Sequence, residues 1–301
     1  MTENSPKSLD PRTLAKLKGL QLRAKHIVEG YVAGLHRSPF RGFSIEFAEH
    51  REYTPGDDLR YVDWKVFGRT DKIHLKQYED ETNLVCYLVL DSSESMQYQG
   101  PDSPLSKFEY AQCLAAAIAW LVLQQQDSVG LVTFDQILRS NLRPSSRASH
   151  LQQILQVLDS TTPVSKTSLG PIFHELAERF TKRGVVIVLS DFLDDVDSLL
   201  AGLKHFQHRR HDVVLFHIMD PAELEFPFTQ PTLFQGMESL PDLLTDPKSL
   251  RKAYLAELQQ FTSQIRAGCR RQGMDYRQCP TDHAFDLILA NYLSQRSVKV
   301  T

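Results

Sequence analysis

The chain has 301 residues, of which 42% are hydrophobic and 24% charged, as in a soluble globular protein with one large domain or one domain and an extension. Its net charge of −3 does not suggest a nucleic-acid surface, and its longest apolar run, residues 113–123, is well short of the roughly 20 residues of a membrane span. No apolar signal segment opens the chain and the four cysteines show no CxxC spacing, so we expect a cytoplasmic protein with reduced thiols.

The first elements are a helix and two short strands. Asp10 as a cap and Pro11 at the first position predict the start of a helix that should end near Gly34. Residues 43–47 and 73–78 alternate apolar and polar side chains, which is typical of strands. We expect the second of them to be an edge strand that leads into a buried strand.

The pattern from residue 84 on is strand and helix repeated, which is typical of βαβ units with a parallel sheet. Strands are predicted at 84–90, 128–134, 137–142, 185–189, 213–218 and 274–278. Helices are predicted at 108–125, 151–158, 169–180, 196–207, 249–272 and 282–295, with a long insertion at 219–247. We therefore predict an α/β fold, a mostly parallel sheet with helices on both faces. Residues 1–80 would form an N-terminal arm with a helix and extra strands, and 81–301 the sheet domain.

The loop after the first buried strand carries the most informative residues. Asp91, Ser93 and Ser95 offer three hard oxygens at alternate positions. In open α/β sheets, ligands bind at the carboxyl ends of the strands. Such oxygens suit Mg²⁺, which takes ligands at about 2.0–2.1 Å and keeps some of its waters. The loop therefore predicts a magnesium site, with Mn²⁺ or Ca²⁺ as alternative ions.

Two more side-chain oxygens are predicted to lie near this loop, where they could complete a metal site. Thr167 lies at a predicted helix start, and Asp191 ends a second buried strand. The alternative is a set of helix N-caps, because Ser, Thr and Asp are favoured there in any case. The ordered set resembles the metal-ion-dependent adhesion site (MIDAS) of von Willebrand factor A domains: Asp91, Ser93, Ser95, Thr167 and Asp191.

This resemblance implies a von Willebrand factor A-like (Rossmann-like) fold and a role for each ligand. The serines would bind Mg²⁺ directly, and Thr167 directly or through water. Asp91 and Asp191 would act through waters and fix the hydroxyls. An acidic residue of a partner would complete the octahedron.

A second resemblance rests on a segment rich in charge, aromatics and turn residues. Its motif is Tyr53, Pro55, Gly56, Asp57, Asp58, Arg60, Asp63 and Trp64, then Gly68 and Arg69, the loop at 91–96 and the stretch at 220–228. From about Gly42 on, the chain resembles the domain-of-unknown-function family 58 (DUF58). That family carries a von Willebrand factor A-like domain and is typically encoded beside MoxR-type AAA+ ATPases. The chain departs from it at Gly68, where alanine is commoner, and at Lys166, where glycine is favoured.

Enzymatic alternatives lack residues that they require. The chain contains neither a P-loop nor a GxSxG nucleophile elbow. A phosphotransfer enzyme with Asp91 as nucleophile would carry a second aspartate where this chain has Ser93. We therefore predict no enzyme. The expected function is divalent-metal-dependent protein binding, as an adaptor or co-chaperone-like partner of a MoxR-type ATPase. The alternatives are a metal-dependent phosphohydrolase at the same site and a metal-free scaffold.

Two segments have both a structural and a functional interpretation. The turn at 54–58 is either a structural turn held by ion pairs, with Trp64 packed in the core, or a partner-docking or regulatory surface. We expect Tyr61 and Trp64 to be buried. The insertion at 219–247 follows a strand and so should lie near the metal loop. Its acids and phenylalanines suit an interface, or the rings cover the sheet rim: Glu223, Glu225, Phe226, Phe228 and Phe234.

Overall fold

A computed structural model of the chain describes residues 10–35, 50–52, 74–76, 84–237, 241–285 and 288–289. Contacts divide the chain into two units, residues 1–34 with 84–301 and residues 35–83. The boundary predicted between residues 80 and 81 stays a prediction.

In the smaller unit, β1 (His50–Glu52) pairs antiparallel with β2 (His74–Lys76). Strand β2 lies inside the predicted strand at 73–78, and its described partner is β1, in a two-stranded sheet. The predicted strand at 43–47 and the turn at 54–58 lie outside the described residues.

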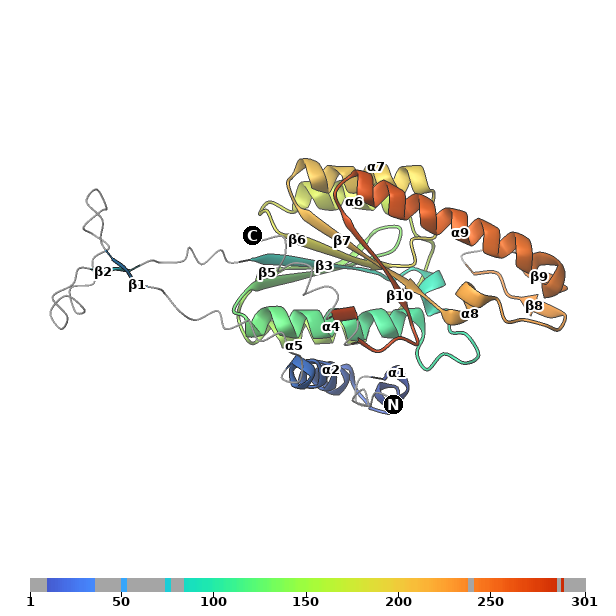
Figure 1. Cartoon of the computed structure of the whole chain (residues 1–301), viewed down its shortest axis with the longest axis horizontal. Coiled ribbons are helices and arrows are strands. Elements are labelled where there is room, and N and C mark those ends of the chain that lie inside the picture. The colour runs from blue at the N-terminus through green and yellow to red at the C-terminus, as the bar shows by residue number, and fades with distance from the viewer. Residues whose placement is uncertain are drawn as a thin grey trace. The chain divides into compact units, whose positions relative to one another are not determined.

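The larger unit is built on a six-stranded sheet of order β10-β7-β6-β3-β4-β5 (Figure 1). Its strands are β3 (Val85–Asp91), β4 (Ser128–Phe134), β5 (Leu138–Ser145), β6 (Val185–Ser190), β7 (Asp212–Met219) and β10 (Asp275–Pro280). All neighbours pair parallel except β5, which runs antiparallel to β4 at one edge. The predicted α/β class, a mostly parallel sheet flanked by helices, is confirmed.

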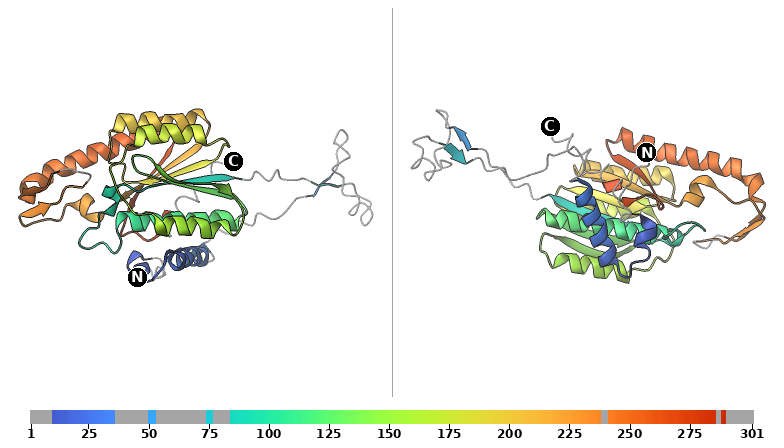
Figure 2. Two further views of the ribbon diagram at one scale, coloured as in Figure 1. Left: turned by 180° about the vertical axis from the view of Figure 1, so that it is seen from behind. Right: turned by 60° about the horizontal axis from the view of Figure 1, so that its bottom comes forward.

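Helices cover both faces of the sheet (Figures 1 and 2). One face holds α4 (Lys107–Gln124) and α5 (His150–Ser160), with α1 (Pro11–Leu14) and α2 (Leu20–Leu35) outside them. The other face holds α6 (Leu169–Arg179), α7 (Val196–His208) and α9 (Pro247–Arg271). Among the described residues, we find no helix both long and apolar enough to span a bilayer.

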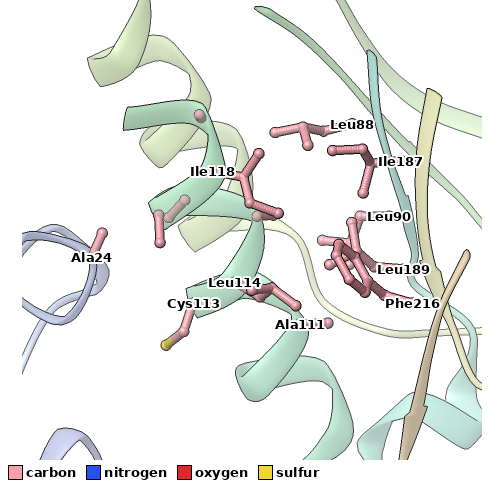
Figure 3. Packing of buried hydrophobic residues seen from close by; sticks show 14 of the residues in the cluster. Ala24, Leu88, Leu90, Ala111, Cys113, Leu114, Ile118, Ile187, Leu189 and Phe216 are labelled. Carbon is pink, nitrogen blue, oxygen red and sulfur yellow. The ribbon is translucent and has the colours of Figure 1, made fainter. Parts of the chain in front are cut away.

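Strand β3 is buried on both sides because its side chains alternate between two cores. Leu88 and Leu90 face α4, where they meet Leu114 and Ile118 of that helix (Figure 3). Val89 faces the opposite core under α6 and α7. Such burial on both faces explains why the sequence runs apolar without a break.

The N-terminal helix is broken, contrary to the single helix expected from Pro11 to Gly34. Asp10 caps α1 as predicted, accepting from the Arg12 amide at 2.8 Å. The chain then turns, and Gly19 adopts φ +92°, a left-handed conformation that glycine tolerates best. Apolar spacing continues through the break, which is why the sequence pattern hid it.

The insertion folds into α8 (Pro221–Glu225) and a hairpin of β8 (Thr232–Phe234) and β9 (Leu243–Thr245). The last predicted helix, at 282–295, falls mostly outside the described residues. Of the described ones, residues 282–284 are not helical, and 285 and 288–289 are.

Candidate functional site

The candidate site lies where the sheet reverses its strand order. From β3, the chain places β4 and β5 on one side and β6, β7 and β10 on the other. Loops after β3 and β6 therefore diverge, and such switch points form crevices for ligands. Asp91 is the last residue of β3, and Asp191 directly follows β6. Both carboxylates thus reach the same edge of the sheet.

Four of the five predicted ligands are linked by hydrogen bonds or charge. Asp91 accepts from the Ser93 amide at 2.8 Å. The hydroxyls of Ser93 and Ser95 lie 3.1 Å apart, and Ser95 is among the groups that lower the pKa of the Asp191 carboxylate. All four side chains are buried. The structure therefore brings Asp91, Ser93, Ser95 and Asp191 together in one polar cluster.

The fifth residue, Thr167, lies on a loop tied to the same cluster. The Ser92 carbonyl accepts from the Val164 amide at 3.0 Å, and the Glu94 amide donates to the Ser165 carbonyl at 2.9 Å. Thr167 is 6% exposed, and its hydroxyl has no hydrogen-bond partner within the described parts of the chain. Because buried polar atoms are nearly always bonded, this hydroxyl is a candidate ligand atom for an ion.

The sequence did not reveal Lys107, the first residue of α4, which is 1% exposed. Its ammonium donates to Asp191 at 2.8 Å and to Glu223 of α8 at 2.7 Å. Sequence analysis started this helix one residue later. The capping box of Ser106 and Glu109 marks its true start, but no local pattern links Lys107 to a partner 84 residues away.

Lys107 makes the two buried aspartates electrostatically different. Burial, and after it the negative charge of Asp191, raise the pKa of Asp91 to about 7 despite hydrogen bonds from Ser190 and Ser93. Burial also opposes ionisation of Asp191, but the Lys107 charge and hydrogen bond outweigh it and hold that pKa below its ordinary value. Asp191 is therefore a paired carboxylate. Asp91 has no cationic side chain within ion-pair distance in the described residues.

The loop after Asp91 is held against the end of β7. Asp220 is fully buried and accepts from the Gly100 amide at 2.9 Å and the Ala222 amide at 2.8 Å. A Cβ at Gly100 would lie 2.2 Å from the Asp220 carboxylate, so only glycine fits there. Glu223 completes the α8 cap by accepting from the Asp220 amide at 2.8 Å. Helix α8 is thus joined to the loop after Asp91 through Asp220, and to Lys107 through Glu223.

The insertion lies near the metal loop, as expected, because Glu223 shares Lys107 with Asp191. Its phenylalanines pack on one another: Phe226 lies 5.7 Å from Phe234 and 4.7 Å from Tyr254 of α9, between ring centroids. The exposed apolar residues are leucines of the hairpin, Leu233, Leu243 and Leu244, which are 53%, 53% and 73% exposed. The rings therefore form the hairpin's own core and the leucines its outer surface.

The donor set fits a hard divalent ion. Within the described residues, no three His, Cys, Asp or Glu side chains gather as a metal site, so hydroxyls would have to supply part of the ligand set. Two serine hydroxyls, an unbonded threonine hydroxyl and the Asp91 carboxylate are oxygens of the kind that Mg²⁺ takes. The segment at 51–64 with Tyr61 and Trp64, and Gly68 and Arg69, lie outside the described residues except for 51–52.

Comparisons with solved structures return matches at low identity, with TM-scores below 0.5. BatB from Bacteroides thetaiotaomicron is 17% identical with a TM-score of 0.45, over 71% of this chain and 98% of that one. The SpRpn10 VWA domain is 14% identical with a TM-score of 0.41, over 69% and 94%. The pilus adhesin SpaC from Lactobacillus rhamnosus GG is 11% identical with a TM-score of 0.47, over 72% and 30%.

Sequence comparisons give a family. Uncharacterized protein Rv1480 of Mycobacterium tuberculosis H37Rv is 27% identical over 234 residues, 76% of this chain and 72% of that protein. Uncharacterized protein Mb1516 of Mycobacterium bovis matches equally well. The family profile described as "Protein of unknown function DUF58" matches residues 49–263. The chain therefore belongs to the DUF58 family, as its motifs predicted.

Proposed function

We propose that this chain is a divalent-metal-dependent protein-interaction module. Its ion would be held by Asp91, Ser93, Ser95 and Thr167, with Asp191 acting through water and through Ser95. The observation that carries the proposal is the Asp91 carboxylate, which is buried without a cationic partner in the described residues. The loop after it is bonded to the segment that carries the unbonded Thr167 hydroxyl. A buried charge is costly unless it is paired or binds a metal.

The bound ion would supply an electropositive coordination position for a carboxylate from another protein. Serine and threonine hydroxyls bring no charge to the ion, and Asp191 is already neutralised by Lys107. Lys107 would therefore have a positioning role: it holds Asp191 and, through it, the Ser95 hydroxyl. We propose binding rather than catalysis, because acid–base work needs a second group beside Asp91, and Lys107 holds Asp191 as a paired carboxylate.

The contact between Lys107 and Asp191 also favours a second candidate, a metal-free scaffold. In that case the Lys107 ammonium is the only cation that the cluster needs, and it joins Asp191 to Glu223. The two candidates differ in one measurable respect. The first requires saturable Mg²⁺ binding that depends on Asp91, and the second requires none.

The partner we propose is a MoxR-type AAA+ ATPase that presents a Glu or Asp to the ion. The test is co-purification of the ATPase with the full chain, first in Mg²⁺ and then in EDTA. Ser93→Ala should abolish capture, because it removes a ligand. Ser92→Ala is the matched control: its hydroxyl donates to the Phe134 carbonyl at 2.8 Å and is not a proposed ligand. Capture that survives both EDTA and Ser93→Ala would contradict the proposal.

The hairpin is tested separately, since its Phe234 packs on Phe226, three residues after Glu223. Leu233→Ala with Leu244→Ala removes exposed apolar surface and leaves the phenylalanine core intact. Loss of capture with Mg²⁺ binding preserved would extend the interface to the hairpin. Turnover of a generic phosphate ester that requires Asp91 would instead support the phosphohydrolase alternative.

A further inference from the structure

A basic pocket lies at the start of β10, the opposite end of the strand from the proposed metal cluster of Asp91, Ser93, Ser95 and Asp191. It encloses about 350 Å³ between the end of α9 and the start of β10. Its walls include Arg266, Arg270 and Arg277 together with Tyr276 and Asp275. None of the three arginines has an ion-pair partner in the described part of the chain. Three positive charges therefore meet one negative charge around a single hollow.

The wall of this pocket is preorganised. The Tyr276 hydroxyl lies 2.6 Å from Nδ1 of buried His217, which fixes the ring from beneath. The guanidinium of Arg266 lies 5.4 Å from the Tyr276 ring centroid, within the range of a cation–π interaction. A guanidinium fixed in this way loses less side-chain entropy when it binds a carboxylate through two parallel hydrogen bonds.

The spacing of the charges suits an extended chain. Arg266 and Arg270 are four residues apart on α9 and thus share one face, about 6 Å apart along the axis. Alternate side chains of a strand repeat at about 6.6 Å. Strand β10 is an edge of the sheet and, among the described residues, pairs only with β7. An edge strand can accept a further strand through its free backbone groups.

We propose that this pocket binds an acidic segment of a partner protein, docked in extended conformation along β10 with alternate carboxylates on Arg266 and Arg270. Arg277 adds positive charge to the pocket from the other face of the strand. The site is independent of the proposed ion, since it shares no residue with the metal cluster. A single carboxylate or phosphate lacks the second contact and would bind weakly.

The test is fluorescence anisotropy with the full chain and a short labelled peptide in which glutamate alternates with threonine. Arg266→Gln with Arg270→Gln should weaken binding by about tenfold or more, because charge-assisted contacts are lost. The matched control is Arg271→Gln, an exposed neighbour on the same helix that does not line the pocket, and it should change affinity by less than about twofold. Circular dichroism checks that every variant is folded.

Several results would overturn the proposal. They are no binding by wild type, equal loss in Arg271→Gln, or equal affinity for a peptide with glutamine in place of glutamate. If inorganic phosphate displaced the peptide with a Kd equal to that of the peptide, the pocket would be a small-anion site. If a single-stranded oligonucleotide bound as tightly as the peptide, it would be a nucleic-acid site. Peptide binding should be unchanged by EDTA, so failure here and failure of the metal-dependent function are distinguishable.

Discussion

The two charged regions of the larger unit differ in how their charges are satisfied. At the switch point, Lys107 and three acids are buried or nearly so, and each has hydrogen bonds or ion pairs within the fold. The acids are Asp91, Asp191 and Glu223. At the start of β10, the arginines are exposed or half-buried and have no ion-pair partners in the described residues. A change in the first region should therefore alter stability together with function. A change in the second should alter binding alone.

The largest expected effect is on stability, from Lys107→Met. It leaves Asp191 and Glu223 buried without their cation, and breaking a buried pair costs about 3–5 kcal/mol. Urea unfolding measures the loss, with Lys204→Met on the exposed surface of α7 as control, expected within about 0.5 kcal/mol. The double change Lys107→Met with Glu223→Gln should recover part of the stability. A loss below about 1 kcal/mol for Lys107→Met would show that the cluster does not need its ammonium.

Thr167→Val should separate the two roles within the first region. The unbonded hydroxyl contributes no hydrogen bond to the metal-free fold, so stability should stay unchanged or rise slightly. Mg²⁺ affinity should fall on the order of tenfold, because a ligand is lost. Thr133→Val is the matched control, since its hydroxyl is also buried and unbonded among the described residues but is not a predicted ligand. Equal loss of affinity in both variants would argue against a specific role for Thr167.

A smaller effect is expected from pH. Asp91 has a folded pKa of about 7, raised from 3.8, so its contribution to stability is fully present below pH 3.8 and is lost as pH rises through 7. Metal-free wild type should therefore lose about 1 kcal/mol between pH 6 and pH 8 relative to Asp91→Asn. Added Mg²⁺ should reverse this trend, because the ion binds the ionised carboxylate. Parallel pH profiles for the two proteins would contradict the assignment.

The exposed region should give no stability change. Arg270→Gln alone should unfold within about 0.5 kcal/mol of wild type and bind Mg²⁺ with unchanged affinity. Urea unfolding and calorimetry check this. A stability loss like that of Lys107→Met would show that the basic pocket belongs to the structural network of the fold after all.

The same contrast explains what could be predicted from sequence. Strand β4 has the bounds predicted from the repeated strand and helix pattern, residues 128–134. The parallel pattern then placed Asp91 and Asp191 at one edge of the sheet. The pairing of Lys107 with Asp191 could not be predicted, because it depends on how α4 packs against β6 rather than on local spacing.

Local geometry accounts for the other differences. The turn at Gly19 was hidden by apolar residues that keep helical spacing on either side of it. The mutual packing of Phe226, Phe234 and Tyr254 joins the insertion to α9, which no pattern within the insertion could indicate. The basic pocket likewise depends on bringing the end of one helix beside the start of a strand.

Isothermal titration of Mg²⁺ into the EDTA-treated and dialysed full chain tests the central claim most directly. The account predicts a single saturable site in wild type and none in Asp91→Asn, with circular dichroism and urea unfolding showing both proteins folded. Saturable binding of equal strength in both proteins would place the ion elsewhere. No binding in wild type would contradict metal dependence and leave Lys107 as the cation of the cluster.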